Sequence, residues 1–437
     1  MSVTPEDRRY MAAAMRLSRW HTGLTATNPS VGAIVVRDGA IVGRAVTAPG
    51  GRPHGETQAL SQAGEKARGA TLYVTLEPCS HHGRTPPCAD AIVAAGISRV
   101  VVSLTDPDPR VCGRGLAILR AAGITVDGGV LEEEGRRALR AYLMRQTKGR
   151  PQVTLKLSVS ADGMIGRKGS PPGEGQVAIT GPAARAQVHV LRAETDAILV
   201  GIGTALADDP DLTCRTPGLE ARSPLRIVLD RRLDLPPTSR LARSAREVPV
   251  LDVAIPPSAL PGTSLSRGKI DGGSGQTYSC TCGDEHYSPT GAVGTGHDGQ
   301  GASSPSTSPL EGKMSPKAAG GGAATASEGL RSDHHVRRAA LAATGVELLE
   351  TETLATLLSA LAARGVSSLL VEGGAAVAKS FLTAGLVDRI LLFEGATTVG
   401  EGGLASPLTR ADIPAGFRLS REDAFGPDRC FEYERFS

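Results

Sequence analysis

The chain has 437 residues, a formal net charge of +3, 3% aromatic residues and seven cysteines. This length predicts two domains, whereas the low charge and the scarcity of aromatic side chains argue against a protein that binds nucleic acid. An odd number of cysteines does not suit a disulfide framework. The sequence contains no run of about 18 apolar residues, which a membrane span would need. We therefore expect a cytoplasmic protein with no nucleic-acid or membrane partner.

Strands and helices alternate in the first part of the chain. In order, the pattern predicts a helix over 6–20, a hairpin of strands 31–36 and 41–44, a helix over 54–63, a strand over 71–76, a helix over 88–95, a strand over 99–104 and a helix over 116–122. Such alternation is typical of an α/β layer structure. The pattern breaks near residue 148, so we expect one domain over 1–147 and a second over 151–437.

The second part of the chain resumes the α/β pattern and contains an insertion. Expected strands cover 153–159, 197–200, 225–229, 369–372 and 389–393, with helices over 182–192 and 375–384. Between 271 and 330, 14 of 60 residues are glycine and few are apolar. We therefore expect a disordered, low-complexity insertion at about 262–335. Its Cys280, Cys282 and His286 form a weak pattern for a second metal site.

The most informative motif combines one histidine, two cysteines and a carboxylate. His54 and Glu56 are followed by Cys79, and Cys88 comes after eight further residues. A zinc ion held by His54, Cys79 and Cys88 keeps its fourth position open for water, which is typical of a catalytic site. Glu56 would move protons, as in the zinc deaminase signature, although that signature separates its cysteines by two residues. A purely structural zinc site is the alternative.

Three stretches of the first part form a longer pattern, Asn28–Gly32, His54–Glu56 and Thr75–Cys88. They closely resemble the bifunctional deaminase/reductase family of riboflavin biosynthesis, and the long cysteine loop is that family's form of the motif. The resemblance implies a cytidine-deaminase-like α/β/α domain with one Zn²⁺ per chain. It implies deamination of 2,5-diamino-6-ribosylamino-4(3H)-pyrimidinone 5′-phosphate, a small phosphorylated pyrimidine. Its expected contacts are with Asn28, His81 and Arg84.

Three stretches of the second part, 154–163, 203–215 and 370–374, resemble the same family's dihydrofolate-reductase-like α/β domain. That domain reduces the ribosyl side chain of the deaminated product to a ribityl chain with NADPH. The resemblance implies NADPH contacts from Val159, Thr204, Asp208, Gly373 and Gly374. It implies substrate contacts from Lys156, Arg192, Leu212, Arg215 and Glu372. It also implies a homo-oligomer.

One loop of the second part departs from the family's pattern. Gln176 and Ala178 stand where the family has Ser and Trp. The resemblance places that Trp beside the nicotinamide, so an active deaminase with an impaired or inactive reductase is an alternative. A nucleic-acid-editing deaminase or binding module is a further alternative, against which the missing basic stripe and stacking aromatics count.

Overall fold

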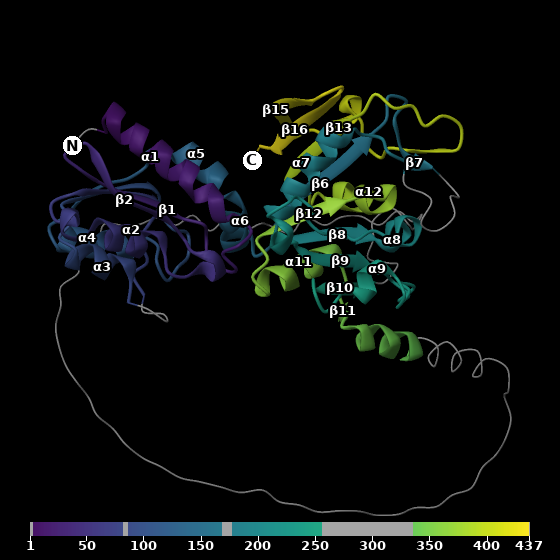
Figure 1. Ribbon diagram of the computed structural model, residues 1–437, viewed down its shortest axis with the longest axis horizontal. Coiled ribbons are helices and arrows are strands. Elements are labelled where there is room, and N and C mark those ends of the chain that lie inside the picture. The colour runs from purple at the N-terminus through teal and green to yellow at the C-terminus, as the bar shows by residue number, and fades with distance from the viewer. Residues whose placement is uncertain (1–2, 82–85, 168–176, 256–334, 437) are drawn as a thin grey trace, which may run out of the picture.

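A computed structural model describes residues 3–81, 86–167, 177–255 and 335–436. Within these ranges the chain forms a five-stranded sheet, order β2-β1-β3-β4-β5, and a nine-stranded sheet, order β11-β10-β9-β8-β12-β6-β13-β16-β15. Figure 1 shows them side by side, the first in purple and blue and the second in teal to yellow. The expected insertion, apart from His335, lies outside the described residues, as do Arg84, Gln176 and the Cys280, Cys282 and His286 pattern.

The first sheet has helices on both faces. Its elements are α1 Pro5–Ser18, β1 Gly32–Arg37, β2 Ala40–Val46, α2 Gly55–Ala63, β3 Thr71–Leu76, α3 Cys88–Ala94, β4 Arg99–Leu104, α4 Arg114–Ala121, β5 Thr125–Asp127, α5 Glu132–Ala138 and α6 Arg140–Lys148. One apolar cluster joins one face to α2, α3 and α4, and another joins the opposite face to α1. The expected α/β/α layering is therefore confirmed.

The hairpin between β1 and β2 forms for a local reason. Asp38 has φ +51° and Gly39 has φ +74°. Two successive left-handed residues make the turn whose twist suits paired strands, and Asp-Gly is a favoured sequence for it.

The second sheet is parallel from β11 to β13 and ends in the antiparallel strands β16 and β15. Its elements are β6 Gln152–Val159, β7 Met164–Arg167, α7 Pro182–Ala193, β8 Ala197–Gly201, α8 Ile202–Asp208, β9 Leu225–Leu229, α9 Arg240–Arg243, β10 Val250–Ala254, β11 Glu347–Glu350, α11 Leu354–Ala363, β12 Ser368–Glu372, α12 Ala375–Thr383, β13 Arg389–Glu394, β14 Gly403–Ala405, β15 Phe417–Phe425 and β16 Asp428–Arg435. This architecture confirms the expected α/β class for the second part.

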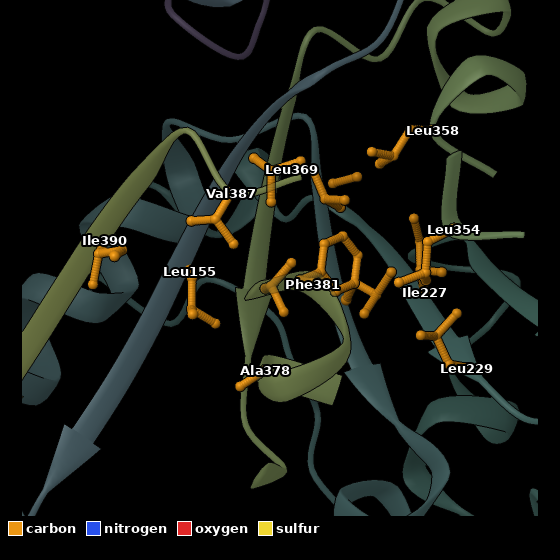
Figure 2. Close-up of a cluster of buried hydrophobic side chains, with 14 of the residues drawn as sticks. Leu155, Ile227, Leu229, Leu354, Leu358, Leu369, Ala378, Phe381, Val387 and Ile390 are labelled. Atoms are coloured by element: carbon orange, nitrogen blue, oxygen red, sulfur yellow. The ribbon is translucent and has the colours of Figure 1, made fainter. Parts of the chain in front are cut away.

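Alternation along the central strands gives this sheet two apolar faces. Figure 2 shows one of them, where Phe381 of α12 lies among strand residues that include Leu155, Ile227 and Leu369. The neighbouring Leu370 belongs to the cluster on the other face, which α7 and α9 cover. That second face also carries the polar residues described below.

Side chains of the first part reach the second part near α6. Arg140 pairs with Glu434, and Arg145 donates from Nε to Ser367 Oγ at 2.9 Å. Figure 1 shows α6 at the junction between the two sheets. No helix in the described ranges is long and apolar enough to cross a membrane.

Candidate functional site

Three potential metal ligands meet near the carboxyl end of β3, the central strand of the first sheet. His54 is the N-cap of α2, Cys88 is the first residue of α3, and Cys79 follows β3. His54 Nδ1 lies 3.3 Å from Cys88 Sγ and 3.7 Å from Cys79 Sγ. In tetrahedral zinc sites with Zn–S near 2.3 Å and Zn–N near 2.0 Å, such ligand atoms lie roughly 3.6 Å apart. The three residues therefore fit a zinc ion.

The cluster favours the thiolate form of Cys79, the form that binds metal. The Cys88 thiol, the His54 ring and the Cys88 backbone N–H all hydrogen-bond with Cys79 Sγ and lower the pKa of its thiol. The thiol of Cys88 donates to Cys79, and this hydrogen bond, together with burial, raises the pKa of Cys88. Cys79 is therefore the anionic ligand before metal binds, and Cys88 would release its proton on binding zinc.

Glu56 lies beside the ligands without being one of them. Its side chain is 3% exposed, in the first turn of α2. It hydrogen-bonds with the Cys88 thiol, and burial raises the pKa of its carboxyl. Its Oε2 is buried and has no hydrogen-bond partner in the part of the chain that the structure describes. One carboxyl oxygen is therefore available to exchange a proton with a molecule at the metal.

His54, Cys79 and Glu56 line a cavity of about 780 Å³. Asn28 and His81, two of the three expected substrate contacts, line it. His81 Nδ1 is buried and also lacks a hydrogen-bond partner in the described ranges. The sequence analysis missed three arginines that line the same cavity, Arg52, Arg110 and Arg145. Guanidinium groups suit phosphate, so these arginines are candidate phosphate contacts, beside four carboxyl groups that line the same cavity, those of Glu56, Glu77, Asp106 and Asp108.

A second set of lining residues follows β4 and was also missed. Asp106 and Asp108 line the cavity, and Tyr142 donates to both carboxyl oxygens of Asp106 at 2.9 and 3.0 Å. Because β4 is parallel to β3, its carboxyl end lies next to the end that carries Cys79. That rule could have located Asp106 and Asp108. Tyr142 comes from α6, for which the sequence carried no signal.

Glu77 holds the loop that contains these aspartates. Its buried carboxylate accepts hydrogen bonds from the backbone N–H groups of Asp106, Gly113, Gly115 and Leu116, at 2.9–3.4 Å. Glu77 therefore orients the cavity wall through the backbone.

In the second part, Lys156, Arg192 and Glu372 form a buried polar cluster. Lys156 and Glu372 are register partners on β6 and β12, with Nζ 4.0 Å from Oε2. Arg192 of α7 donates two hydrogen bonds to the Glu372 carboxylate, of 2.8 and 3.0 Å. Burial opposes ionisation of Glu372, but Arg192 and Lys156 lower its pKa to about 2. Burial lowers the pKa of Lys156. These three expected substrate contacts therefore lie together.

The expected cofactor loop also assembles around Thr204. Gly373 and Gly374 have φ +86° and +59°, in the region that favours glycine. A Cβ at Gly373 would lie 3.2 Å from Thr204 Cγ2, and one at Gly374 would lie 3.0 Å from Thr204 Oγ1. The absence of side chains leaves backbone room next to the start of α12, as a phosphate would need.

The four remaining expected contacts differ in how far their side chains are exposed to solvent. Val159 and Leu212 are 5% and 3% exposed, and their side chains belong to the apolar clusters. Asp208 ends α8, and burial raises the pKa of its carboxyl. Arg215 forms an exposed ion pair with Asp211, at 2.9 Å.

His189 of α7 contacts one of the expected substrate residues. The Arg215 backbone N–H donates to Nδ1 of His189, a residue of α7 that the sequence analysis missed, at 3.2 Å. Ala178 is exposed.

Comparison with known proteins agrees with both sites. A model of the RibD C-terminal domain matches residues 151–255 and 325–431, and one of the cytidine and deoxycytidylate deaminase zinc-binding region matches residues 4–104. Riboflavin biosynthesis protein RibD of Escherichia coli (strain K12) is 46% identical over 253 residues, which is 55% of this chain and 68% of that protein. The chain belongs to the RibD family.

Other RibD proteins show the same relation. RibD of Aquifex aeolicus (strain VF5) is 46% identical over 246 residues, 56% of this chain and 67% of its own length. The structure of Acinetobacter baumannii RibD (form 1) matches with a TM-score of 0.73 and 29% identity, over 99% of both chains. A Thermotoga maritima deaminase/reductase matches with a TM-score of 0.70 and 28% identity, also over 99% of both.

Family membership confirms the expected combination of a zinc-binding deaminase part and a RibD reductase part. The chain is thus a bifunctional deaminase and reductase of riboflavin biosynthesis. Zinc belongs to its His54, Cys79 and Cys88 cluster, and a nicotinamide cofactor belongs to its reductase part.

Proposed function

We propose that the chain deaminates 2,5-diamino-6-ribosylamino-4(3H)-pyrimidinone 5′-phosphate and then reduces the ribosyl side chain of the product with NADPH. The Thermotoga maritima relative is described as a diaminohydroxyphosphoribosylaminopyrimidine deaminase and 5-amino-6-(5-phosphoribosylamino)uracil reductase. One observation carries the proposal: His54 and Cys79 of the metal cluster line, together with Glu56, a cavity that three arginines also line. This arrangement suits a polar ring that bears a phosphate.

In deamination, water replaces the amino group of the ring and ammonia leaves. His54, Cys79 and Cys88 would hold a zinc ion, which would lower the pKa of a bound water molecule to about 7. Glu56 takes one proton from the attacking water and delivers it to the ring nitrogen. It then takes the second proton, from the new hydroxyl on the ring carbon, and delivers it to the departing amine, since one carboxyl can act in turn as base and acid. Asn28 and His81 orient the pyrimidine, and Arg84 binds the phosphate.

In reduction, bound NADPH would supply a hydride to the sugar carbon attached to the exocyclic amino nitrogen, and the bond from that carbon to the ring oxygen of the sugar would break. The residues of the chain position both reactants. We assign Thr204, Asp208, Val159 and the Gly373-Gly374 loop to the cofactor. Lys156, Arg192 and Glu372 hold the sugar phosphate side chain, with Leu212 and Arg215 at the edge of the site. Because burial lowers its pKa, Lys156 gives up a proton more readily than an ordinary lysine and can deliver it to the ring oxygen of the sugar as that oxygen is released.

The Glu56→Gln variant tests the deaminase assignment. Gln cannot exchange protons, so we expect the kcat for ammonia release to fall by about 10²- to 10⁴-fold. Zinc content, measured by elemental analysis, stays at wild-type level because Glu56 is not a ligand. Glu65→Gln, at an exposed glutamate nearby, is the matched control and keeps full activity. Unchanged turnover in Glu56→Gln would contradict the role of Glu56.

A second candidate is a deaminase with an impaired reductase. The exposed Ala178 at the position where the family has Trp favours it, because a flanking aromatic ring would be missing. Ala178→Trp tests this idea. A large gain in substrate-dependent NADPH oxidation would support the impaired form, and an unchanged rate would exclude packing at this position as the cause.

We further propose a cytoplasmic homo-oligomer. No disulfide joins the described cysteines, and a thiolate zinc site and NADPH both suit a reducing compartment. Light scattering of the purified protein checks the assembly, and fractionation of cells checks the compartment. A monomer, or protein outside the cytoplasm, would contradict the respective proposal.

A further inference from the structure

The loop that carries Asn28 has a strained backbone. Ala26, two residues earlier, has φ +50° although it is not glycine. Thr25 Oγ1 donates to the Asn28 carbonyl at 2.6 Å, and the Asn28 N–H donates to the Thr25 carbonyl at 3.0 Å. A non-glycine residue in this region persists only where its surroundings hold it. The position of Asn28 therefore depends on what packs against residues 24–28.

Part of that support comes from the first half of the chain. The Gly50 N–H donates to the Leu24 carbonyl at 2.8 Å. Gly51 approaches Asn28 so closely that a Cβ there would lie 2.3 Å from Asn28 Nδ2. Arg145 of α6 donates to the Thr27 carbonyl. Its guanidinium lies 5.8 Å from the centre of the Tyr142 ring and lines the cavity.

Residues of the reductase half also support the loop that carries Asn28. Arg145 Nε donates to Ser367 Oγ at 2.9 Å. Gly365 packs against Thr27, and a Cβ at Gly365 would lie 2.5 Å from Thr27 Cγ2. Ser367 is itself anchored, because its N–H and that of Ser368 both donate to Asp196 Oδ2 at 2.8 Å.

We propose that Arg145 is a positioning residue of the deaminase site, which ties the Asn28 loop to Ser367, so that the reductase half completes the deaminase site. One guanidinium bridges the Thr27 carbonyl of the first half and a hydroxyl of the second. Arg145 acts through Thr27 on the adjacent Asn28. The inference rests on the proposed deaminase function.

Ser367→Ala is the most specific test, because it changes the reductase half and is measured in the deaminase reaction. Loss of one hydrogen bond of ordinary strength predicts a rise of about fivefold in the deaminase KM. We expect kcat within about twofold of wild type, because Glu56 and the zinc ligands are untouched. NADPH oxidation with the deaminated substrate stays unchanged. Ser420→Ala, whose hydroxyl bonds to Glu432 within the reductase half, is the matched control and leaves both reactions unchanged.

Variants at Arg145 distinguish a residue that bridges the two halves of the chain from one that only binds the substrate phosphate. Arg145→Lys keeps the charge but lacks the planar fork, so we expect it to raise the deaminase KM as much as Arg145→Ala does. In a double-mutant cycle, adding Ser367→Ala to Arg145→Ala has no further effect, because the bridge is already lost. Arg140→Ala removes another ion pair between the halves, away from the cavity, and leaves the KM unchanged.

Three outcomes would overturn the inference. One is an unchanged deaminase KM in Ser367→Ala. Another is full rescue by Arg145→Lys, with an effect of Arg145→Ala that vanishes on a substrate without its phosphate, which would make Arg145 a phosphate ligand. The third is an equal effect of Arg140→Ala, which would mean general docking of the halves. Wild-type protein that releases no ammonia would instead refute the proposed function itself.

Discussion

Two buried carboxylates of the reductase half have opposite electrostatic surroundings. Glu372 lies between Arg192 and Lys156 and keeps its charge. Asp252 of β10 is fully buried, and neither of its oxygens has a hydrogen-bond partner in the described ranges. Burial, reinforced by Asp230, raises the pKa of Asp252 to about 8. Glu372 is a candidate for binding, and the buried Asp252 bears on stability.

The raised pKa of Asp252 predicts a pH dependence of stability. The folded state holds a proton that the unfolded chain releases near pH 4, so this contribution is complete below pH 4 and is lost as the pH rises toward about 8. Asp252→Asn stays neutral at every pH. We expect urea unfolding at pH 8.5 to show the variant more stable than wild type by at least about 1 kcal/mol, and much less so at pH 5. Glu401→Gln, at an exposed site, is the control. A difference that does not change with pH would contradict this account.

At the same scale, the spacing of His54, Glu56, Cys79 and Cys88 predicted the metal cluster, because local helix and strand ends carry these residues. Lys156, Arg192 and Glu372 were named only through family resemblance, and the structure brings them together. Arg145 and Tyr142 could not be predicted. Their place at the cavity depends on how α6 packs, and α6 has no distinctive sequence pattern.

At the scale of elements, one buried polar side chain of α1 adds to its apolar contacts with the sheet. The Asp7 carboxylate accepts hydrogen bonds from Arg99 of β4 at 2.7 and 3.0 Å, from Tyr73 of β3 at 2.8 Å and from the Thr4 N–H at 2.8 Å. Arg99 above all holds the pKa of Asp7 well below its usual range. A lowered pKa gives stability that is present above about pH 4 and is lost as the pH falls.

Asp7→Asn removes the charge from this buried junction. We expect the free energy of unfolding to fall by about 3 kcal/mol at pH 7, because breaking one partner of a buried ion pair leaves the other uncompensated. Urea unfolding followed by circular dichroism measures it. The neighbouring Glu6→Gln, at an exposed carboxylate, changes stability by less than about 0.5 kcal/mol. Equal effects of the two variants would contradict the role of Asp7.

The elements that sequence patterns predicted are those with strong apolar periodicity or clear ends, such as β3, β4 and α7. The exposed strand β15 and the short α5 lacked that signal, since tertiary pairing rather than local pattern stabilises them. Helix ends shifted by one or two residues, as for α1, which ends at Ser18 and continues as a single 3₁₀ turn to His21.

At the scale of the whole molecule, each half has its own apolar clusters. We retain residues 1–147 and 151–437 as the proposed domain limits, since β6 begins at Gln152. Arg150 in the linker forms two 2.7 Å hydrogen bonds with Asp388, so the linker itself is held by the second half. The two active sites thus belong to separate cores that meet at α6.

The most direct test follows both half-reactions in one sample of zinc-loaded protein. The diaminopyrimidine phosphate is added first without NADPH, and ammonia is measured; NADPH is then added, and its absorbance is followed. The account predicts one equivalent of ammonia per substrate before NADPH is present, and then one equivalent of NADPH oxidised. Absence of ammonia release would contradict the central claim, and ammonia without NADPH oxidation would leave only the deaminase.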